Sequence, residues 1–194
     1  MNEFHVDDRS NRERMEAGDW YLGDDPELIA EGRRAAALAA RYHAAFVSND
    51  EDAHAILDQL IGQLGAHVEI RPPLYVDYGR YISIGAGTYI NYNFTALDVA
   101  AITIGRDCQI GPNVQLLPST HPVPAEPRQQ KWEAGHPITI GDNVWLGGGV
   151  IVLAGVTIGD NSVVGAGAVV TKDIPTDVVA VGNPARVIKP LPSD

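Results

Sequence analysis

The stretch that decides the fold covers residues 138–171 and reads ITIGDNVWLGGGVIVLAGVTIGDNSVVGAGAVVT. An aliphatic residue returns at every sixth position of this stretch: Ile140, Leu146, Val152, Ile158, Val164 and Val170. Neither an α-helix, with about 3.6 residues per turn, nor a single β-strand, with alternating side chains, produces this period. A coil of three short strands does, when each strand and its turn take six residues and glycine permits the turn. We therefore predict a β-helix of hexapeptide repeats.

The same period appears upstream and is interrupted once. It runs through Ile84, Ile90 and Ala96, and again through Ile104, Ile110 and Leu116. It then stops until Ile140, and the intervening chain, residues 117–137, reads LPSTHPVPAEPRQQKWEAGHP. The prolines and charges of this segment predict an inserted loop. A long loop in a compact repeat domain usually carries function.

Two helices are predicted ahead of the repeats. Asp25, Pro26 and Glu27 combine an N-cap, a first-turn proline and a favourable negative charge, and the first helix continues to about Phe46. A second helix from Ala53 has its apolar residues on one face. Because solenoids need covered ends, we expect this pair to cap the first coil. The predicted domains are a helical cap at 1–71, the β-helix with its loop (117–137) at 72–188, and a tail at 189–194.

Composition narrows the class of protein. The net charge of −11 argues against a nucleic-acid partner, which requires a basic surface. No apolar stretch is long enough to span a membrane, and the first residues lack the apolar core of a signal peptide. Cys108 is the one cysteine, and we predict that it is a small core residue and not a nucleophile. A chain without a possible internal disulfide suits a reducing compartment, so we expect a cytoplasmic protein.

Several segments together resemble a known family. They are PPLYVDYG (72–79), NYNFTALDV (91–99), STHPV (119–123), the hexapeptide run that ends in VTKDIP (170–175), and GNPARVIK (182–189). With these motifs the chain resembles the hexapeptide-repeat O-acetyltransferases, most closely the maltose and galactoside acetyltransferase group. The resemblance implies a left-handed parallel β-helix and a homotrimer with active sites between neighbouring subunits. It also implies acetyl-CoA as donor and a hydroxyl group, expected on a sugar, as acceptor.

Direct transfer from a thioester to a hydroxyl requires a general base with a pKa near neutrality, which histidine provides. By resemblance the catalytic base is His121, in the STHPV segment. The loop context alone also allows a purely structural histidine. His136 is a rival because it begins a second His-Pro pair, although its place next to the restart of the repeat favours a role in closing the loop.

The resemblance also places the binding residues. Asn91 would contact the acceptor or the base, although asparagine also suits left-handed turns. Asp98 would contact the acceptor, although the family's acidic residue falls at Asp98 or one position later, at Val99. A further acceptor-binding carboxylate of the family falls on Gly23, with Asp24 beside it, and this departure leaves the acceptor open. The predicted acetyl-CoA contacts are Trp145, Gly148, Ala166, Thr171, Lys172 and Arg186.

Each of these acetyl-CoA contacts has a structural alternative. Trp145 would then be an outward-facing residue of the solenoid, and Gly148 and Ala166 small residues at tight turns. Thr171, Lys172 and Arg186 would be solvated surface residues, although lysine and arginine are the expected partners of nucleotide phosphates.

Other functions stay open at this point. The acceptor hydroxyl could belong to an antibiotic or to serine, or the solenoid could be a catalytically silent scaffold. Zinc-dependent relatives need three histidines at a site, and the predicted solenoid has only His121 and His136, in one loop. We therefore expect no metal.

Overall fold

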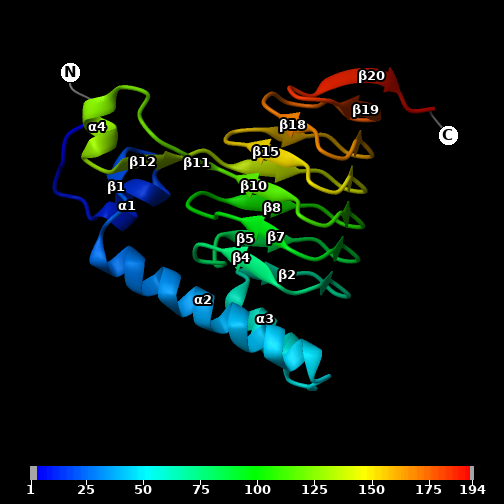
Figure 1. Cartoon of the computed structure of the whole chain (residues 1–194), viewed down its shortest axis with the longest axis horizontal. Coiled ribbons are helices and arrows are strands. Elements are labelled where there is room, and N and C mark those ends of the chain that lie inside the picture. Colours follow the sequence, from blue (N-terminus) through cyan, green and yellow to red (C-terminus); the bar gives the residue numbers. More distant parts are fainter. Residues whose placement is uncertain (1–3, 193–194) are drawn as a thin grey trace.

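The computed structural model describes residues 4–192 as a stack of three-sided coils with helices across one end (Figure 1). The first side of the stack is a parallel sheet of β2, β5, β8, β13 and β16, the second is formed by β3, β6, β9, β14, β17, β19 and β20, and the third by β4, β7, β10, β15 and β18. The chain visits the three sides in turn. The predicted left-handed parallel β-helix is confirmed.

The strands are short. Those of the first side are Gln63–Leu64, Ile82–Ile84, Ile102–Ile104, Ile138–Ile140 and Thr157–Ile158. Those of the second side are Glu69–Ile70, Tyr89–Ile90, Gln109–Ile110, Trp145–Leu146, Val163–Val164, Val178–Val181 and Arg186–Pro190, the last of which runs antiparallel. Those of the third side are Leu74–Val76, Phe94–Ala96, Gln115–Leu117, Ile151–Leu153 and Val169–Val170.

The residues at the six-residue period form the core. Ile140 pairs in register with Ile104 on one neighbouring coil and with Ile158 on the other, and all three are at most 1% exposed. Cys108 belongs to the same buried cluster, as predicted, and its Sγ lies 3.1 Å from the carbonyl oxygen of Gly141. Burial raises the pKa of this thiol. The column of inward side chains therefore joins all coils into one core.

Helices α2 (Pro26–Val47) and α3 (Ala53–Leu60) cover the first coil. The predicted start of α2 is confirmed, because the Asp25 carboxylate accepts the N–H groups of Glu27 and Leu28. Tyr42 packs in the solenoid core and donates its hydroxyl to the carbonyl of Ile70. No helix among residues 4–192 is long and apolar enough to cross a membrane.

The first coil begins before the boundary predicted at residue 72. Strands β2 and β3 pair in parallel with β5 and β6, so they belong to the β-helix and not to the cap. Gly65 lies at a corner of this coil, where an added Cβ would approach the amide nitrogen of Ala86 at 2.3 Å. The apolar spacing of Leu60, Ile61 and Leu64 fits a helix face as well as inward positions of a coil.

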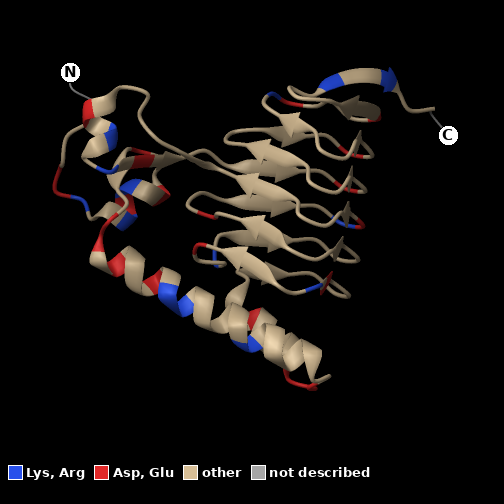
Figure 2. Ribbon diagram, in the orientation of Figure 1, with Lys and Arg blue, Asp and Glu red and all other residues tan. Residues whose placement is uncertain are grey.

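The inserted loop and the first residues form a side module next to the stack. It consists of α1 (Asn11–Glu16), β1 (Tyr21–Leu22), β11 (Ser119–Thr120), α4 (Ala125–Gln129) and β12 (Trp132–Gly135). Strand β12 is the centre of an antiparallel sheet, with β1 on one edge and β11 on the other. Charged residues gather on the helices, in this module and at the corners of the coils, whereas the strands of the stack carry few (Figure 2).

Asp98 fixes the corner that precedes the second coil. It is fully buried, and its two carboxylate oxygens accept the backbone N–H groups of Asp77, Tyr78 and Tyr81 at 2.8–3.1 Å. Asp77 lies directly beside it. The pKa of Asp77 rises to about 7, because its carboxyl is buried and because Asp98 and Glu133 place negative charge nearby. This corner therefore concentrates carboxyl groups next to the side module.

The core column gives a first prediction. Replacing Ile140 by Ala removes buried methylene groups and leaves a cavity between coils, so we expect the free energy of unfolding to fall by about 2–5 kcal/mol. Urea denaturation at a fixed protein concentration measures the change. Thr139→Ala, on the exposed face of the same strand, is the control and should cost much less. Equal losses for the two variants would contradict the proposed role of the column.

The carboxyl corner gives a second prediction. The pKa of Asp77 is 3.8 without the fold and about 7 within it, so its contribution to stability is complete below about pH 4 and is lost as the pH rises through 7. Asp77→Asn stays neutral throughout. We expect the unfolding midpoint of the wild type to fall more steeply between about pH 4 and pH 7 than that of Asp77→Asn. Glu51→Gln, at an exposed turn, should keep the wild-type slope, and equal slopes for all three proteins would refute the assignment.

Candidate functional site

A cavity of about 480 Å³ opens beside His121 in the side module. It is lined by Gly23, Asp24, His121, Arg128, Lys131 and Glu133. His121 follows β11 directly and is exposed to solvent. Its Nδ1 lies 3.3 Å from the carbonyl oxygen of Trp132. In the tautomer that satisfies this contact, Nδ1 carries the proton and donates it to the carbonyl, which leaves a lone pair on Nε2.

Glu133 is the residue of this cavity that the sequence analysis missed. Burial raises the pKa of its carboxyl, while the nearby charge of His121 and a hydrogen bond from the Tyr21 hydroxyl favour the ionised form. Tyr21 itself is buried in the side module. A signal existed in the sequence, because Glu133 stands between the apolar residues Trp132 and Ala134 in a strand-like alternation.

Gly23 makes room for this carboxylate. A Cβ at position 23 would lie 2.7 Å from Oε2 of Glu133. The expected acceptor-binding carboxylate of the family falls on Gly23, and in this chain Glu133 fills the space that a side chain there would need. The departure noted in the sequence therefore has a structural counterpart on the neighbouring strand.

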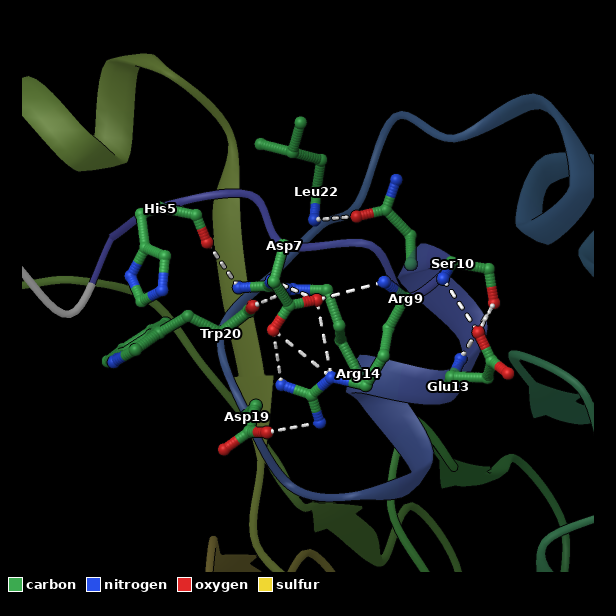
Figure 3. A network of polar contacts seen from close by, with 10 residues as sticks. His5, Asp7, Arg9, Ser10, Glu13, Arg14, Asp19, Trp20 and Leu22 are labelled. Carbon is green, nitrogen blue, oxygen red and sulfur yellow. Dashed lines mark hydrogen bonds and ion pairs between the residues drawn. The ribbon is translucent and has the colours of Figure 1, made fainter.

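The N-terminal segment packs against β12, the strand whose Trp132 contacts His121, and Figure 3 shows the polar contacts of Arg14 within that segment. Arg14 is only 3% exposed and donates to the backbone carbonyls of Trp20, at 2.8 Å, and His5, at 2.6 Å. It also forms an ion pair with Asp7. Its guanidinium carbon lies 5.6 Å from the ring centroid of Trp132, a favourable cation–π distance. Residues far apart in the sequence thus fix Trp132, whose carbonyl contacts the histidine.

A second hollow, of about 490 Å³, runs along the second side and its corner with the third side. Four predicted residues lie in it: Asn91, Trp145, Gly148 and Ala166. Trp145 is 56% exposed, which is unusual for so large an apolar side chain. The structure therefore brings the predicted acceptor residue Asn91 together with three of the predicted acetyl-CoA contacts.

The remaining predicted residues lie elsewhere. Thr171 and Lys172 follow β18 at the corner between the third and first sides, whereas Arg186 begins β20 and pairs with Val181 on the second side. All three side chains are exposed. Asp98 lines neither cavity, because its carboxylate is buried against the backbone of residues 77–81. Within one chain, four of the predicted residues thus lie in the groove and His121 lies at its own cavity, while Asp98, Thr171, Lys172 and Arg186 line neither.

The two cavities occupy different corners of the stack. The loop that carries His121 leaves at the end of β10 and returns at β13, between the third and first sides. The groove with Trp145 lies between the second and third sides. A ligand in the groove therefore does not meet His121 of the same chain at that corner. In residues 4–192 no group of three histidine, cysteine, aspartate or glutamate side chains is placed to hold a metal ion.

Comparison with known proteins identifies the family. Residues 14–65 match the maltose acetyltransferase hexapeptide capping motif, and residues 137–172 match the bacterial transferase hexapeptide of six repeats. The chain is 48% identical to Nodulation protein L of Rhizobium meliloti (strain 1021) over 92% of its own length and 98% of that protein.

Solved structures agree with this match. A maltose O-acetyltransferase from Clostridium difficile 630 is 41% identical, with a TM-score of 0.93 over 96% of this chain and all of that one. A galactoside acetyltransferase in complex with coenzyme A is 39% identical, with a TM-score of 0.91 over 95% of this chain and 92% of that one. The chain therefore belongs to the hexapeptide-repeat O-acetyltransferases of the maltose and galactoside group, and it is an acyltransferase.

Proposed function

We propose that this protein transfers an acetyl group from acetyl-CoA to a sugar hydroxyl, with His121 as the general base. The observation that carries the proposal is the setting of His121. Its Nδ1 contacts the carbonyl of Trp132, and the ring stands in a solvent-open cavity beside Glu133. That arrangement leaves Nε2 free to accept a proton. The coenzyme A bound in the related galactoside acetyltransferase supports the donor, and the maltose and galactoside names of the relatives support the acceptor.

The proposed reaction is direct. Nε2 of His121 takes the proton of the acceptor hydroxyl as its oxygen attacks the thioester carbonyl. The tetrahedral intermediate then collapses, the carbon–sulfur bond breaks, and the imidazolium returns the proton to the departing CoA thiolate. Glu133 would stabilise the imidazolium, since its charge already interacts with that of His121. The products are the acetyl ester and free CoA.

The groove is the proposed acetyl-CoA site. The exposed ring of Trp145 is available for packing against acetyl-CoA, and the small residues Gly148 and Ala166 leave space in the groove. Within the described part of the chain, the amide N–H of Gly148 donates no hydrogen bond, so it is free to stabilise the oxyanion. Thr171, Lys172 and Arg186 are proposed to contact the nucleotide end, where two cations suit phosphates.

Asn91 is proposed to contact the acceptor from the groove. Asp98 is proposed to help place the acceptor site by holding the corner at 77–81.

The separation of the two cavities favours an active site between subunits. His121 of one subunit would face the groove of its neighbour, which requires a closed ring, and we propose a homotrimer. With its single buried thiol the enzyme suits the cytoplasm. A non-sugar hydroxyl acceptor is the alternative within the same chemistry. The alternative without acetyl transfer is a catalytically silent scaffold.

The base assignment gives a third prediction. His121→Ala should lower kcat by about 10²–10⁴-fold, because the hydroxyl loses its proton acceptor, while the KM for acetyl-CoA changes little. The measurement is release of free CoA thiol from acetyl-CoA with a panel of neutral sugars and without any. His136→Ala, in the other His-Pro pair of the loop, is the matched control. Full activity of His121→Ala would exclude it as the base, and a lack of release with every sugar would point to another acceptor or to a scaffold.

The subunit arrangement gives a fourth prediction. Ala166→Trp fills the groove and His121→Ala removes the base, so each variant alone should be inactive. After the two are mixed 1:1, unfolded and refolded together, about one quarter of the sites in random trimers combine an intact base with an intact groove. Recovery of that share of activity supports a site between subunits. Mixing without refolding is the control, and no recovery after refolding would place both halves of the site in one chain.

A further inference from the structure

Lys131 adopts a backbone conformation that does not suit lysine. It follows the last residues of α4 with φ +69°, its N–H donates to the carbonyl of Arg128, and its carbonyl accepts the N–H of Gly23 at 3.2 Å. Glycine and asparagine are the residues that favour this left-handed position after a helix. The backbone bonds would form with glycine at a lower conformational cost. The side chain of Lys131 must therefore provide a benefit that offsets the cost of this backbone conformation.

The side chain of Lys131 lines the cavity of His121. Across residues 4–192 no acceptor or carboxylate pairs with its ammonium group. Lysine is also scarce in this acidic chain, which has it only at positions 131, 172 and 189. An unpaired cation is thus held, in a costly backbone conformation, on the wall of the cavity that contains the proposed base.

Arg128 contributes a second cation to the same wall. Its Nη1 donates to the carbonyls of Pro122 and Val123, at 3.1 and 2.7 Å, which anchors the guanidinium to the loop just after His121. These carbonyl contacts leave its charge uncompensated. The carboxylates of the cavity do not compensate it either, since no ion pair in the described chain joins Asp24 or Glu133 to Arg128 or Lys131.

We propose that Lys131, assisted by Arg128, binds an anionic substituent of the acceptor. The preferred acceptor is then a sugar that carries a carboxylate, sulfate or phosphate group in addition to the hydroxyl that is acetylated. This inference rests on the proposed function, because it places the acceptor in the cavity of His121. An anion there gains charge-assisted hydrogen bonds from two cations that have no other charged partner. Lys131 and Arg128 supply local positive charge, beside the carboxyl groups of Asp24 and Glu133, in a chain whose net charge is −11.

Acetyl transfer to glucuronate and to glucose tests the proposal in the full-length enzyme. For the wild type we expect a kcat/KM about tenfold higher for glucuronate, carried by a lower KM. Lys131→Met should abolish this preference, because its kcat/KM for glucuronate falls about tenfold, to the value expected for an acceptor without the anionic group. The preference of the wild type should also shrink as salt is raised from about 0.05 to 0.5 M, because mobile ions screen exposed charges.

Two further variants serve as controls. Arg41→Met removes the same charge from an exposed position on α2 and should keep the preference for glucuronate. Lys131→Gly relieves the left-handed conformation, so it should lose the preference and raise the unfolding midpoint by about 2–4 °C. A loss of preference together with a gain in stability separates recognition of the anion from a structural role of the lysine.

The outcomes for the two proposals are distinct. Equal preference in the wild type and Lys131→Met overturns the role of Lys131 and leaves the acetyltransferase proposal standing. If no sugar accepts an acetyl group, binding of glucuronate to the enzyme with CoA, followed by ligand-observed NMR, replaces the kinetic test. Saturable binding that weakens about tenfold in Lys131→Met then supports anion recognition, and binding that is absent or unchanged refutes it.

Discussion

Each coil of the β-helix points its aliphatic side chains at the axis, where they contact the coils above and below. No coil can bury this surface alone, so every coil depends on its neighbours. The register follows from the same requirement, because a shift by one residue would turn the aliphatic side chains toward water. The coil at the end of the stack must also bury its aliphatic surface. Tyr42 and Leu57 of the two helices join the core that Ile70 and Leu74 begin. Because this column of aliphatic side chains fixes the coils and their corners, it also fixes where both cavities lie.

The side module holds the histidine of a surface loop in a fixed position beside the rigid stack. A histidine on a long surface loop would ordinarily be poorly fixed. Here the loop starts from β10 and returns to β13, both anchored in the core, and β12 pairs with a strand from the N-terminal segment. Arg14 then packs on Trp132 from behind. The carbonyl that contacts His121 is therefore fixed by three separate parts of the chain.

The repeat could be predicted from the sequence because its period is long and its residues are buried on every coil. The start of α2 was predictable for a local reason, the capping chemistry of Asp25. The start of the first coil was not, since the spacing of Leu60, Ile61 and Leu64 satisfies both a helix and a coil. The internal strands of the inserted loop were missed because β12 pairs with β1, more than a hundred residues away. The partnership of Glu133 with Tyr21 and Gly23 depends on that pairing, so local patterns did not reveal it.

The positions of the three tryptophans give the protein an optical property of its own. Trp20 and Trp132 lie in the side module, where Phe4 packs close to both rings, while Trp145 lies open in the groove. Trp132 is buried and Trp20 half-buried, so these two rings and the exposed ring of Trp145 should emit at different wavelengths and respond differently to a water-soluble quencher. Intrinsic fluorescence thus carries separate signals from the surroundings of His121 and from the groove, so occupancy of one can be followed without labelling the other.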